Sequence, residues 1–259
     1  MGIKALAVAA IGSIILIVQG LAAEAADVRL IMATPVVGAV KELGTQFEHD
    51  TGNKLITKIS SGPGVKQEID AGETFDLAIS ITPVIDALIK EGKLVADTRA
   101  DVAYGSLGLG VRPGAAKPDI GSVEAFKRTM LNAKSVAYSG EGAGGAYFRG
   151  LIERLGIADQ MKTTLKPMKE DDYVRAIRNG DAEMIVGAIS NVMEFGADLV
   201  DPLPVELQNY IQFAAGVSVS AKETEAAKAL IKLLTAPSAV AVIKAKGLEP
   251  GTVRPVATK

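Results

Sequence analysis

A strand, a glycine-rich turn, a helix and a second strand follow one another in residues 55–81. The β-branched run 55–59 leads into Ser60-Ser61-Gly62-Pro63-Gly64, a helical pattern continues to residue 70, and a second apolar run begins at Phe75. In such a unit the turn lies at the carboxyl end of the first strand, where the helix amides point outward. Amides and serine hydroxyls directed at one point will hold an anion. The unit therefore predicts an α/β fold that binds a small anionic solute.

The rest of the chain alternates strand and helix in the same way, which predicts a parallel sheet with helices on its faces. Apolar runs and helical periodicity predict strands at Val28–Ala33, Ser135–Tyr138, Leu165–Met168, Met184–Ile189 and Ile211–Val219. The same patterns predict helices at Val36–His49, Val84–Glu91, Val123–Met130, Ala146–Leu155, Tyr173–Asn179, Val192–Phe195, Glu223–Leu234 and Pro237–Lys246.

Two features divide this series into two lobes. The apolar run Tyr104–Val111 interrupts the alternation, and Asp201-Pro202-Leu203-Pro204 reads as a linker. We expect one lobe to comprise residues 26–105 plus 210–259 and the other to comprise residues 106–209. Ligands of such folds lie in the cleft between the lobes, and the lobes close by a hinge at the ends of a few elements.

The N-terminus has the pattern of an export signal. A single lysine precedes the uncharged stretch 5–23, and Ala23 and Ala25 fit the small-x-small rule for cleavage after Ala25. A cut after Ala23 or Ala26 is the alternative site, and an uncleaved anchor is the alternative interpretation, although the run is near the lower length limit for a membrane span. We expect a signal peptide at 1–25 and a mature chain in the periplasm.

Composition excludes several classes of function. The chain has no cysteine, which excludes a lipid-modified cysteine, disulfides and thiol chemistry. A net charge of −2 provides no long-range attraction for nucleic acid or anionic lipid. The absence of Trp argues against a stacking platform for sugars or bases. No His, Asp and Glu residues have the spacing of metal ligands. We expect a monomer without metal, cofactor or nucleic acid.

Several short motifs follow one another along the mature chain in a characteristic order. They are Phe47-Glu48-His49-Asp50-Thr51-Gly52, Ser60-Ser61-Gly62 followed by Gln67, Gly72 and Asp76, Gly145-Ala146-Tyr147 followed by Leu155-Gly156, Gly180-Asp181-Ala182-Glu183, and Gly247-Leu248-Glu249-Pro250. In this order the chain resembles the periplasmic substrate-binding proteins of the molybdate-importer family, over nearly its whole mature length. The resemblance implies a type II periplasmic-binding fold that presents an oxyanion to the membrane component of an ABC importer.

Two positions depart from the pattern of that family. A family serine that offers its hydroxyl and amide to the oxyanion corresponds to Ala33-Thr34-Pro35-Val36, and Pro35 has no N–H. Thr34 is expected to be the N-cap of a helix that begins at Pro35, and its hydroxyl is also a candidate ligand contact. A family tyrosine of the second lobe corresponds to Ala188, with Ser190 and Asn191 as the nearest polar replacements. Both changes argue against molybdate.

The loop Ser139-Gly140-Glu141-Gly142-Ala143-Gly144-Gly145 follows a predicted strand and opens a helix. Its glycines match G-x-G-x-x-G, but a dinucleotide site is not expected in an exported protein. We interpret the loop as a second anion cradle facing Ser60 and Ser61 across the cleft. The candidate ligand contacts of this cradle are Ser139, Gly142, Gly145 and Tyr147.

Two charged side chains complete the set of candidates. Lys66, in the first turn of the helix after Ser61, is positioned to meet a carboxylate, or it is a solvated surface charge. Glu141 either faces solvent, as loop residues commonly do, or acts as a general base or acid on a bound organic acid.

Two functions remain open. The first is an ABC-importer receptor for a small anion, with an organic carboxylate favoured over molybdate. The second is an enzyme on the same scaffold, because the molybdate-binding-like group also includes periplasmic aconitate isomerases, which interconvert cis- and trans-aconitate by proton transfer. Fold alone does not decide between them.

Overall fold

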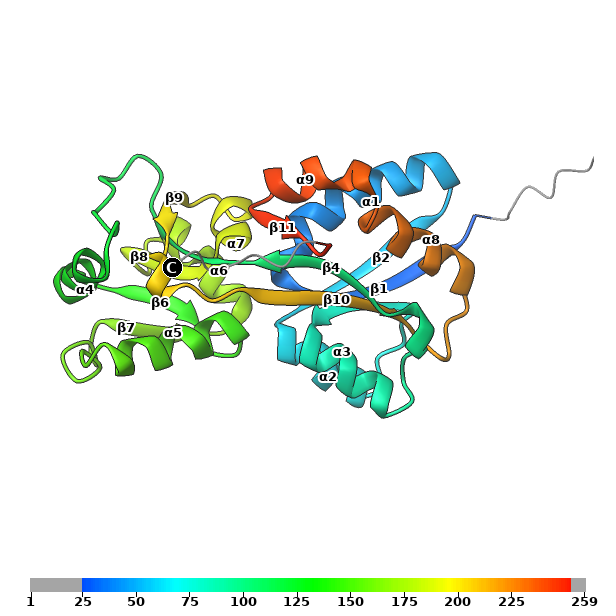
Figure 1. Ribbon diagram of the computed structural model, residues 1–259, viewed down its shortest axis with the longest axis horizontal. Coiled ribbons are helices and arrows are strands. Elements are labelled where there is room, and N and C mark those ends of the chain that lie inside the picture. The colour runs from blue at the N-terminus through cyan, green and yellow to red at the C-terminus, as the bar shows by residue number, and fades with distance from the viewer. Residues whose placement is uncertain (1–24, 253–259) are drawn as a thin grey trace, which may run out of the picture.

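The computed structural model describes residues 25–252, apart from the side chains at positions 171 and 174. The predicted signal peptide, residues 1–25, lies outside the described residues except for Ala25. The described chain forms two α/β lobes side by side (Figure 1).

The first lobe is built on a six-stranded sheet in the order β11-β4-β10-β3-β1-β2. Its strands are β1 (Asp27–Ala33), β2 (Lys54–Ser60), β3 (Leu77–Ile81), β4 (Ala100–Gly105), β10 (Ile211–Val217) and β11 (Leu248–Pro250). One face is covered by α1 (Val37–Thr51), α8 (Thr224–Leu234) and α9 (Val240–Ala245), and the other by α2 (Gly62–Asp70) and α3 (Thr82–Lys90) (Figure 1). Each face buries its own apolar core.

The second lobe is built on a five-stranded sheet in the order β7-β6-β8-β5-β9. Its strands are β5 (Leu107–Val111), β6 (Val136–Ser139), β7 (Leu165–Met168), β8 (Met184–Ala188) and β9 (Asp198–Pro202). The helices α4 (Val123–Asn132) and α5 (Ala143–Arg154) share one apolar core, while α6 (Glu170–Asn179) and α7 (Ile189–Glu194) share the other. Short 3-10 helices η1 (Thr34–Val36), η2 (Ala96–Thr98), η3 (Val205–Leu207) and η4 (Pro237–Ala239) connect the larger elements.

The chain changes sheet at two places, between Gly105 and Leu107 and between Pro202 and Ile211. Gln208 joins the two crossings, because its side chain accepts a hydrogen bond from the Leu107 amide at 2.8 Å and donates one to the Leu107 carbonyl at 2.9 Å. That residues 26–105 plus 210–259 and residues 106–209 move as independent units stays a prediction.

Three local expectations from the sequence are corrected. The sheets are mixed rather than parallel, because β10 and β4 run antiparallel to their neighbours, as do β5 and β9. The expected linker at Asp201–Pro204 begins inside β9, an edge strand, where Pro202 at the last position needs no N–H for a ladder. Thr34 is not an N-cap: Ala33 occupies that position, and Thr34 is the first residue of η1.

Within residues 25–252 no single helix is long and apolar enough to span a membrane. The bent pair Thr224–Leu234 and Pro237–Ala245 passes the same test by length and composition. Leu230, Leu234 and Ile243 of this pair are buried in the core of the first lobe.

Candidate functional site: the cleft between the lobes

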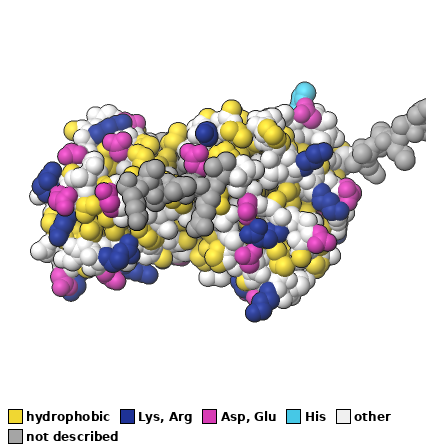
Figure 2. Space-filling view, viewed as in Figure 1, with side chains coloured by type: hydrophobic (Ala, Val, Ile, Leu, Met, Phe, Trp, Pro, Cys, Tyr) yellow, Lys and Arg dark blue, Asp and Glu magenta, His cyan; other side chains and the backbone are white. Residues whose placement is uncertain are grey.

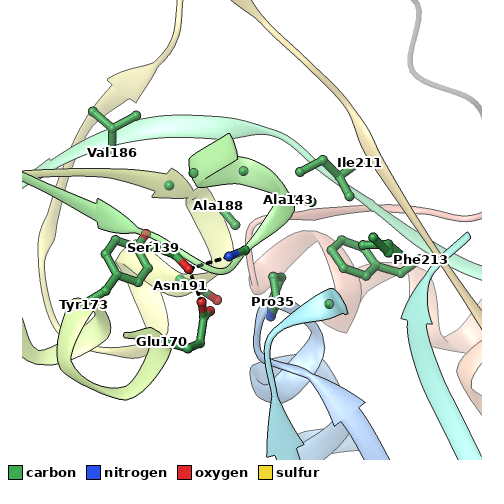
Figure 3. A pocket seen from close by; sticks show the side chains of 16 residues that line it. Pro35, Ser139, Ala143, Glu170, Tyr173, Val186, Ala188, Asn191, Ile211 and Phe213 are labelled. Carbon is green, nitrogen blue, oxygen red and sulfur yellow. Dashed lines mark hydrogen bonds between the residues drawn. The ribbon is translucent and has the colours of Figure 1, made fainter. Parts of the chain in front are cut away.

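A cavity with about 430 Å³ of empty space, part of it open solvent, lies between the two lobes. Within it, the centre of a water molecule could occupy a volume of about 40 Å³. By the same measure a single buried water needs roughly 10–15 Å³. The first lobe contributes Pro35, Gly62, Ile81, Ile211 and Phe213, and the second contributes Ser139, Gly142–Gly145, Glu170, Tyr173, Val186–Ala188 and Asn191 (Figure 3). In this conformation the cleft has room for a solute of a few heavy atoms.

The N-terminus of α5 forms one wall of the cavity. Its first intrahelical bond runs from the Ala146 amide to the Gly142 carbonyl, so the amides of Ala143, Gly144 and Gly145 are first-turn donors. Within residues 25–252 these three amides have no hydrogen-bond acceptor. Partial positive charge at a helix N-terminus favours an anion there.

Ser139, at the end of β6, fixes this turn. Its hydroxyl accepts a hydrogen bond from the Gly142 amide at 2.8 Å and donates one to Glu170 Oε2 at 2.5 Å (Figure 3). Gly145 is required by the close approach of the backbone, because a Cβ there would lie 1.7 Å from the Ser139 carbonyl oxygen. The predicted cradle residues Ser139, Gly142 and Gly145 therefore meet at one wall of the cleft.

The first turn of α6 brings two groups to the same cavity that the sequence analysis did not identify. Glu170 places a carboxyl group beside Ser139. Tyr173 is 1% exposed, and its hydroxyl has no hydrogen-bond partner among the described residues. Burial, and secondarily the charge of Glu170, raises the pKa of Tyr173 far above its ordinary value. The phenol therefore keeps its proton and serves as a hydrogen-bonding group rather than a base.

The helix α7 carries the predicted residues Ser190 and Asn191, both 4% exposed. Asn191 lines the cleft, and its Oδ1 is buried without a partner in the described part of the chain. The Ser190 hydroxyl is also buried and unpartnered among these residues, but Ser190 lines a different cavity, with Gly38, Met193 and Lys246. The structure thus brings Asn191, but not Ser190, into the cleft.

The first-lobe wall is apolar, and the hydroxyl groups of Thr34 and Ser61 make local hydrogen bonds. Ser61 is the N-cap of α2, and its side chain accepts a hydrogen bond from the Gly64 amide at 3.0 Å. The Thr34 hydroxyl donates to the Ser60 carbonyl at 3.0 Å. Thr34, Ser60 and Ser61 therefore hold the strand ends together beside the cleft, while Gly62 lines it.

Three further predicted residues lie away from the cavity wall. Lys66 is bonded to Asp70 Oδ2 at 2.8 Å and to Glu91 Oε2 at 2.9 Å, and these hydrogen bonds, led by that of Asp70, raise the pKa of the lysine. The Tyr147 hydroxyl donates to the Leu207 carbonyl at 3.1 Å. Glu141 is exposed. We leave these residues out of the proposed site.

Residues 28–249 match the sequence profile described as bacterial extracellular solute-binding protein. The chain belongs to this family. It is 31% identical to the molybdate-binding protein ModA of Azotobacter vinelandii over 240 residues, which cover 87% of this chain and 91% of that protein. It is 26% identical to an aconitate isomerase of a Pseudomonas species over 226 residues, with coverage of 85% and 86%.

Among solved structures, the Azotobacter vinelandii periplasmic molybdate-binding protein superposes with a TM-score of 0.74 at 20% identity. That match covers 88% of this chain and all of the other. The two-lobed type II periplasmic-binding fold expected from the sequence is thereby confirmed.

The cleft of this solute-binding protein has no cationic side chain among its described lining residues. Within residues 25–252 no Lys or Arg lines the cavity, and Glu170 is the carboxyl group in its wall. On the visible face, side chains of both signs are interspersed over the outside of the two lobes (Figure 2). Binding of an anion therefore depends on amide and hydroxyl dipoles rather than on a cationic side chain.

The two departures noted in the sequence lie in the cavity wall. Pro35 lines the cleft without an N–H, and Ala188 lines it without a hydroxyl. Tyr173 supplies a phenol from another element, packed against Gly187 of β8. In the described part of the chain no group of three or more His, Cys, Asp or Glu side chains is arranged to hold a metal ion.

Proposed function

We propose that this chain is a periplasmic receptor for a small organic anion, which it delivers to an ABC importer. The observation that carries the proposal is the set of three unpaired first-turn amides of α5 at the wall of the interlobe cavity. Amides without acceptors at a helix N-terminus bind carboxylate or phosphate-like groups. Membership of the extracellular solute-binding family and the similarity to ModA support the transport role.

An organic carboxylate fits this cleft better than molybdate does. A tetrahedral dianion needs donors on several sides, and in the wall Pro35 has no N–H and Ala188 has no side-chain hydroxyl. Glu170 places an acceptor, not a donor, next to Ser139, and a carboxylate repels an oxygen that carries full negative charge. A planar carboxylate needs donors on one side only, and α5 provides them.

The location and assembly are part of the same proposal. We propose that residues 1–25 are removed on export, that no lipid is attached because the chain has no cysteine, and that the mature protein works as a monomer without nucleic acid. Its partner is the membrane component of an importer. The periplasmic molybdate-binding protein with the same fold supports this location.

A panel of anions tests the receptor function. Thermal unfolding of the mature protein is measured with lactate, acetate, citrate, molybdate and sulfate, each at high concentration. A ligand at about 100 times its Kd stabilises by ~2.7 kcal/mol, which corresponds to a shift of roughly 5–10 °C for a chain of this size. We expect such a shift with a monocarboxylate. A large shift with molybdate alone would contradict the proposal.

A second function, aconitate isomerisation, is favoured by the carboxyl group in the cleft and by the aconitate isomerase among the relatives. In that reaction a base takes a proton from the methylene carbon of aconitate, and the electron pair delocalises over three carbons. A proton returned to the opposite carbon shifts the double bond, so no net proton is consumed. Glu170, rather than the exposed Glu141, is the carboxylate able to meet a bound substrate.

Turnover decides this alternative. Mature protein is incubated with trans-aconitate, and the cis isomer is followed by chromatography. If the chain is an isomerase, Glu170→Gln abolishes turnover while Glu141→Gln retains it. No turnover by the unmodified protein eliminates the isomerase function and leaves the receptor function standing. In this conformation the cavity has room for a few heavy atoms, so aconitate also requires a more open cleft.

A further inference from the structure

The wall of the cleft contains both hydrogen-bond donors and buried hydrogen-bond acceptors. The donors are the α5 amides at Ala143–Gly145 and the phenol of Tyr173. The acceptors are Asn191 Oδ1, which is buried without a partner among residues 25–252, and the carboxyl of Glu170. A ligand that satisfies this wall must present anionic oxygens on one side and an O–H on another.

Leaving Asn191 Oδ1 without a donor is costly, since an unmade hydrogen bond in a buried site carries the desolvation penalty of the group. Glu170 favours a ligand that carries a hydrogen-bond donor for a different reason. Its charge opposes an anionic oxygen nearby, whereas a ligand hydroxyl can donate to it. Both groups therefore select for a donor on the ligand, and they come from different elements, α7 and α6.

The volume of the cleft limits the size of such a ligand. In this conformation only a small part of the cavity admits a solute, which suits a short carboxylate bearing one hydroxyl. The apolar first-lobe wall, formed by Ile81, Ile211 and Phe213 among others, suits a hydrocarbon portion.

We propose that the solute is a short 2-hydroxycarboxylate, with its carboxylate on the α5 amides and its one O–H donating to Asn191 Oδ1 beside the Glu170 carboxylate, and that Asn191 and Glu170 act as specificity-determining residues. This inference rests on the proposed receptor function and specifies its substrate class. Fully deprotonated molybdate and sulfate carry no O–H that could donate to Asn191 Oδ1, so we expect both to bind more weakly than a 2-hydroxycarboxylate.

Paired ligands test the inference by isothermal titration calorimetry. Racemic lactate and propionate share a carbon skeleton and differ in the 2-hydroxyl. We expect lactate to bind at least about tenfold more tightly, because propionate leaves Asn191 Oδ1 without a donor. Equal affinities would overturn the inference while leaving the receptor function for organic carboxylates intact. Binding of molybdate with neither acid bound would instead overturn the receptor proposal.

Two variants locate the effect. In Asn191→Leu, which keeps similar volume without the acceptor, the ratio of lactate to propionate affinity should fall about 3- to 10-fold. In Glu170→Gln the ratio should also fall, and sulfate, which we expect not to bind the unmodified protein, should begin to bind. Glu141→Gln makes the same chemical change at an exposed position of the neighbouring loop and should alter nothing. Circular dichroism verifies that each variant is folded.

Hydrogen phosphate provides the remaining comparison, because it too is an oxyanion with an attached O–H. Preferential binding of hydrogen phosphate over both lactate and sulfate would overturn the hydroxycarboxylate assignment. Unchanged discrimination in both Asn191→Leu and Glu170→Gln would overturn the role given to these two residues.

Discussion

Tyr173 and Gly187 are fitted to each other at the wall of the cleft. A Cβ at position 187 would lie 1.6 Å from the phenol oxygen and 2.7 Å from Cζ of Tyr173. Both distances are far below van der Waals contact, so the glycine permits the aromatic ring to occupy this space. Because position 187 of β8 is a glycine, the Tyr173 hydroxyl of α6 can lie at the cavity wall.

Gly187→Ala should therefore destabilise the protein. The ring is 1% exposed and packed on all sides, so overpacking should lower the free energy of unfolding by about 1–3 kcal/mol. Urea denaturation measures the change. Gly150→Ala is the matched control, because a Cβ in the middle of α5 meets only Arg154 Nη1 at 3.6 Å. That variant should gain about 0.5–1 kcal/mol, and equal effects at the two positions would contradict this account.

Single residues also mark the limit of prediction from sequence. Ser139, Gly142 and Gly145 could be placed at the cleft because a turn after a strand and before a helix has a known location. Glu170 could not, since the run Lys169-Glu170-Asp171-Asp172 reads as the solvated start of a helix. Its proximity to Ser139 follows from the order of the strands, in which β7 lies next to β6, and strand order is not visible in a local pattern.

Among the elements, those with strong periodicity and clear end signals were predicted within a few residues. Gly52 caps the C-terminus of α1 and Gly180 caps that of α6. Both glycines have positive φ, a common signal for the end of a helix. Short strands at the crossings were missed. The apolar run Tyr104–Val111 divides between β4 and β5 at Ser106, because the chain changes sheet there, and apolarity alone carries no sign of the change.

Gln208 is the side chain that ties the two crossings together. In Gln208→Ala both hydrogen bonds to the Leu107 backbone are lost, and we expect a decrease of about 1–3 kcal/mol in the free energy of unfolding, since each net bond contributes about 0.5–1.5 kcal/mol. Amide exchange at Leu107 should accelerate. Gln67→Ala, at an exposed position of α2, should change stability by less than about 0.5 kcal/mol. Unchanged exchange at Leu107 would contradict the claim that Gln208 holds the two crossings together.

At the scale of the whole molecule, the lobes also meet outside the cavity. Lys41 of α1 and Glu194 of α7 form an ion pair across the lobes, with 3.1 Å between Nζ and Oε1. The lysine is 60% exposed and the carboxylate 23% exposed, so the pair contributes at most about 1 kcal/mol and is screened by salt. It favours the arrangement in which the two walls of the cleft face each other.

The Lys41–Glu194 pair does not line the cavity. Its removal should therefore weaken ligand binding only through the arrangement of the two lobes. We expect Glu194→Gln to reduce the affinity for lactate by up to about fivefold at low salt, with the difference from unmodified protein diminishing as salt is added. Glu225→Gln breaks a comparable exposed pair with Lys228 inside α8 and should leave affinity unchanged. Identical behaviour of the two variants would mean that the Lys41–Glu194 pair does not stabilise the arrangement in which the two walls of the cleft face each other.

The central claim is that the α5 amides at the interlobe cleft hold the carboxylate of the solute. Nuclear magnetic resonance of the ¹⁵N-labelled mature protein, titrated with lactate, tests it most directly. We expect large, saturable shifts of the Ala143, Gly144 and Gly145 amide signals, with the signals of Lys66 and His49 unchanged. Saturable lactate binding that leaves these three amides unshifted would contradict it.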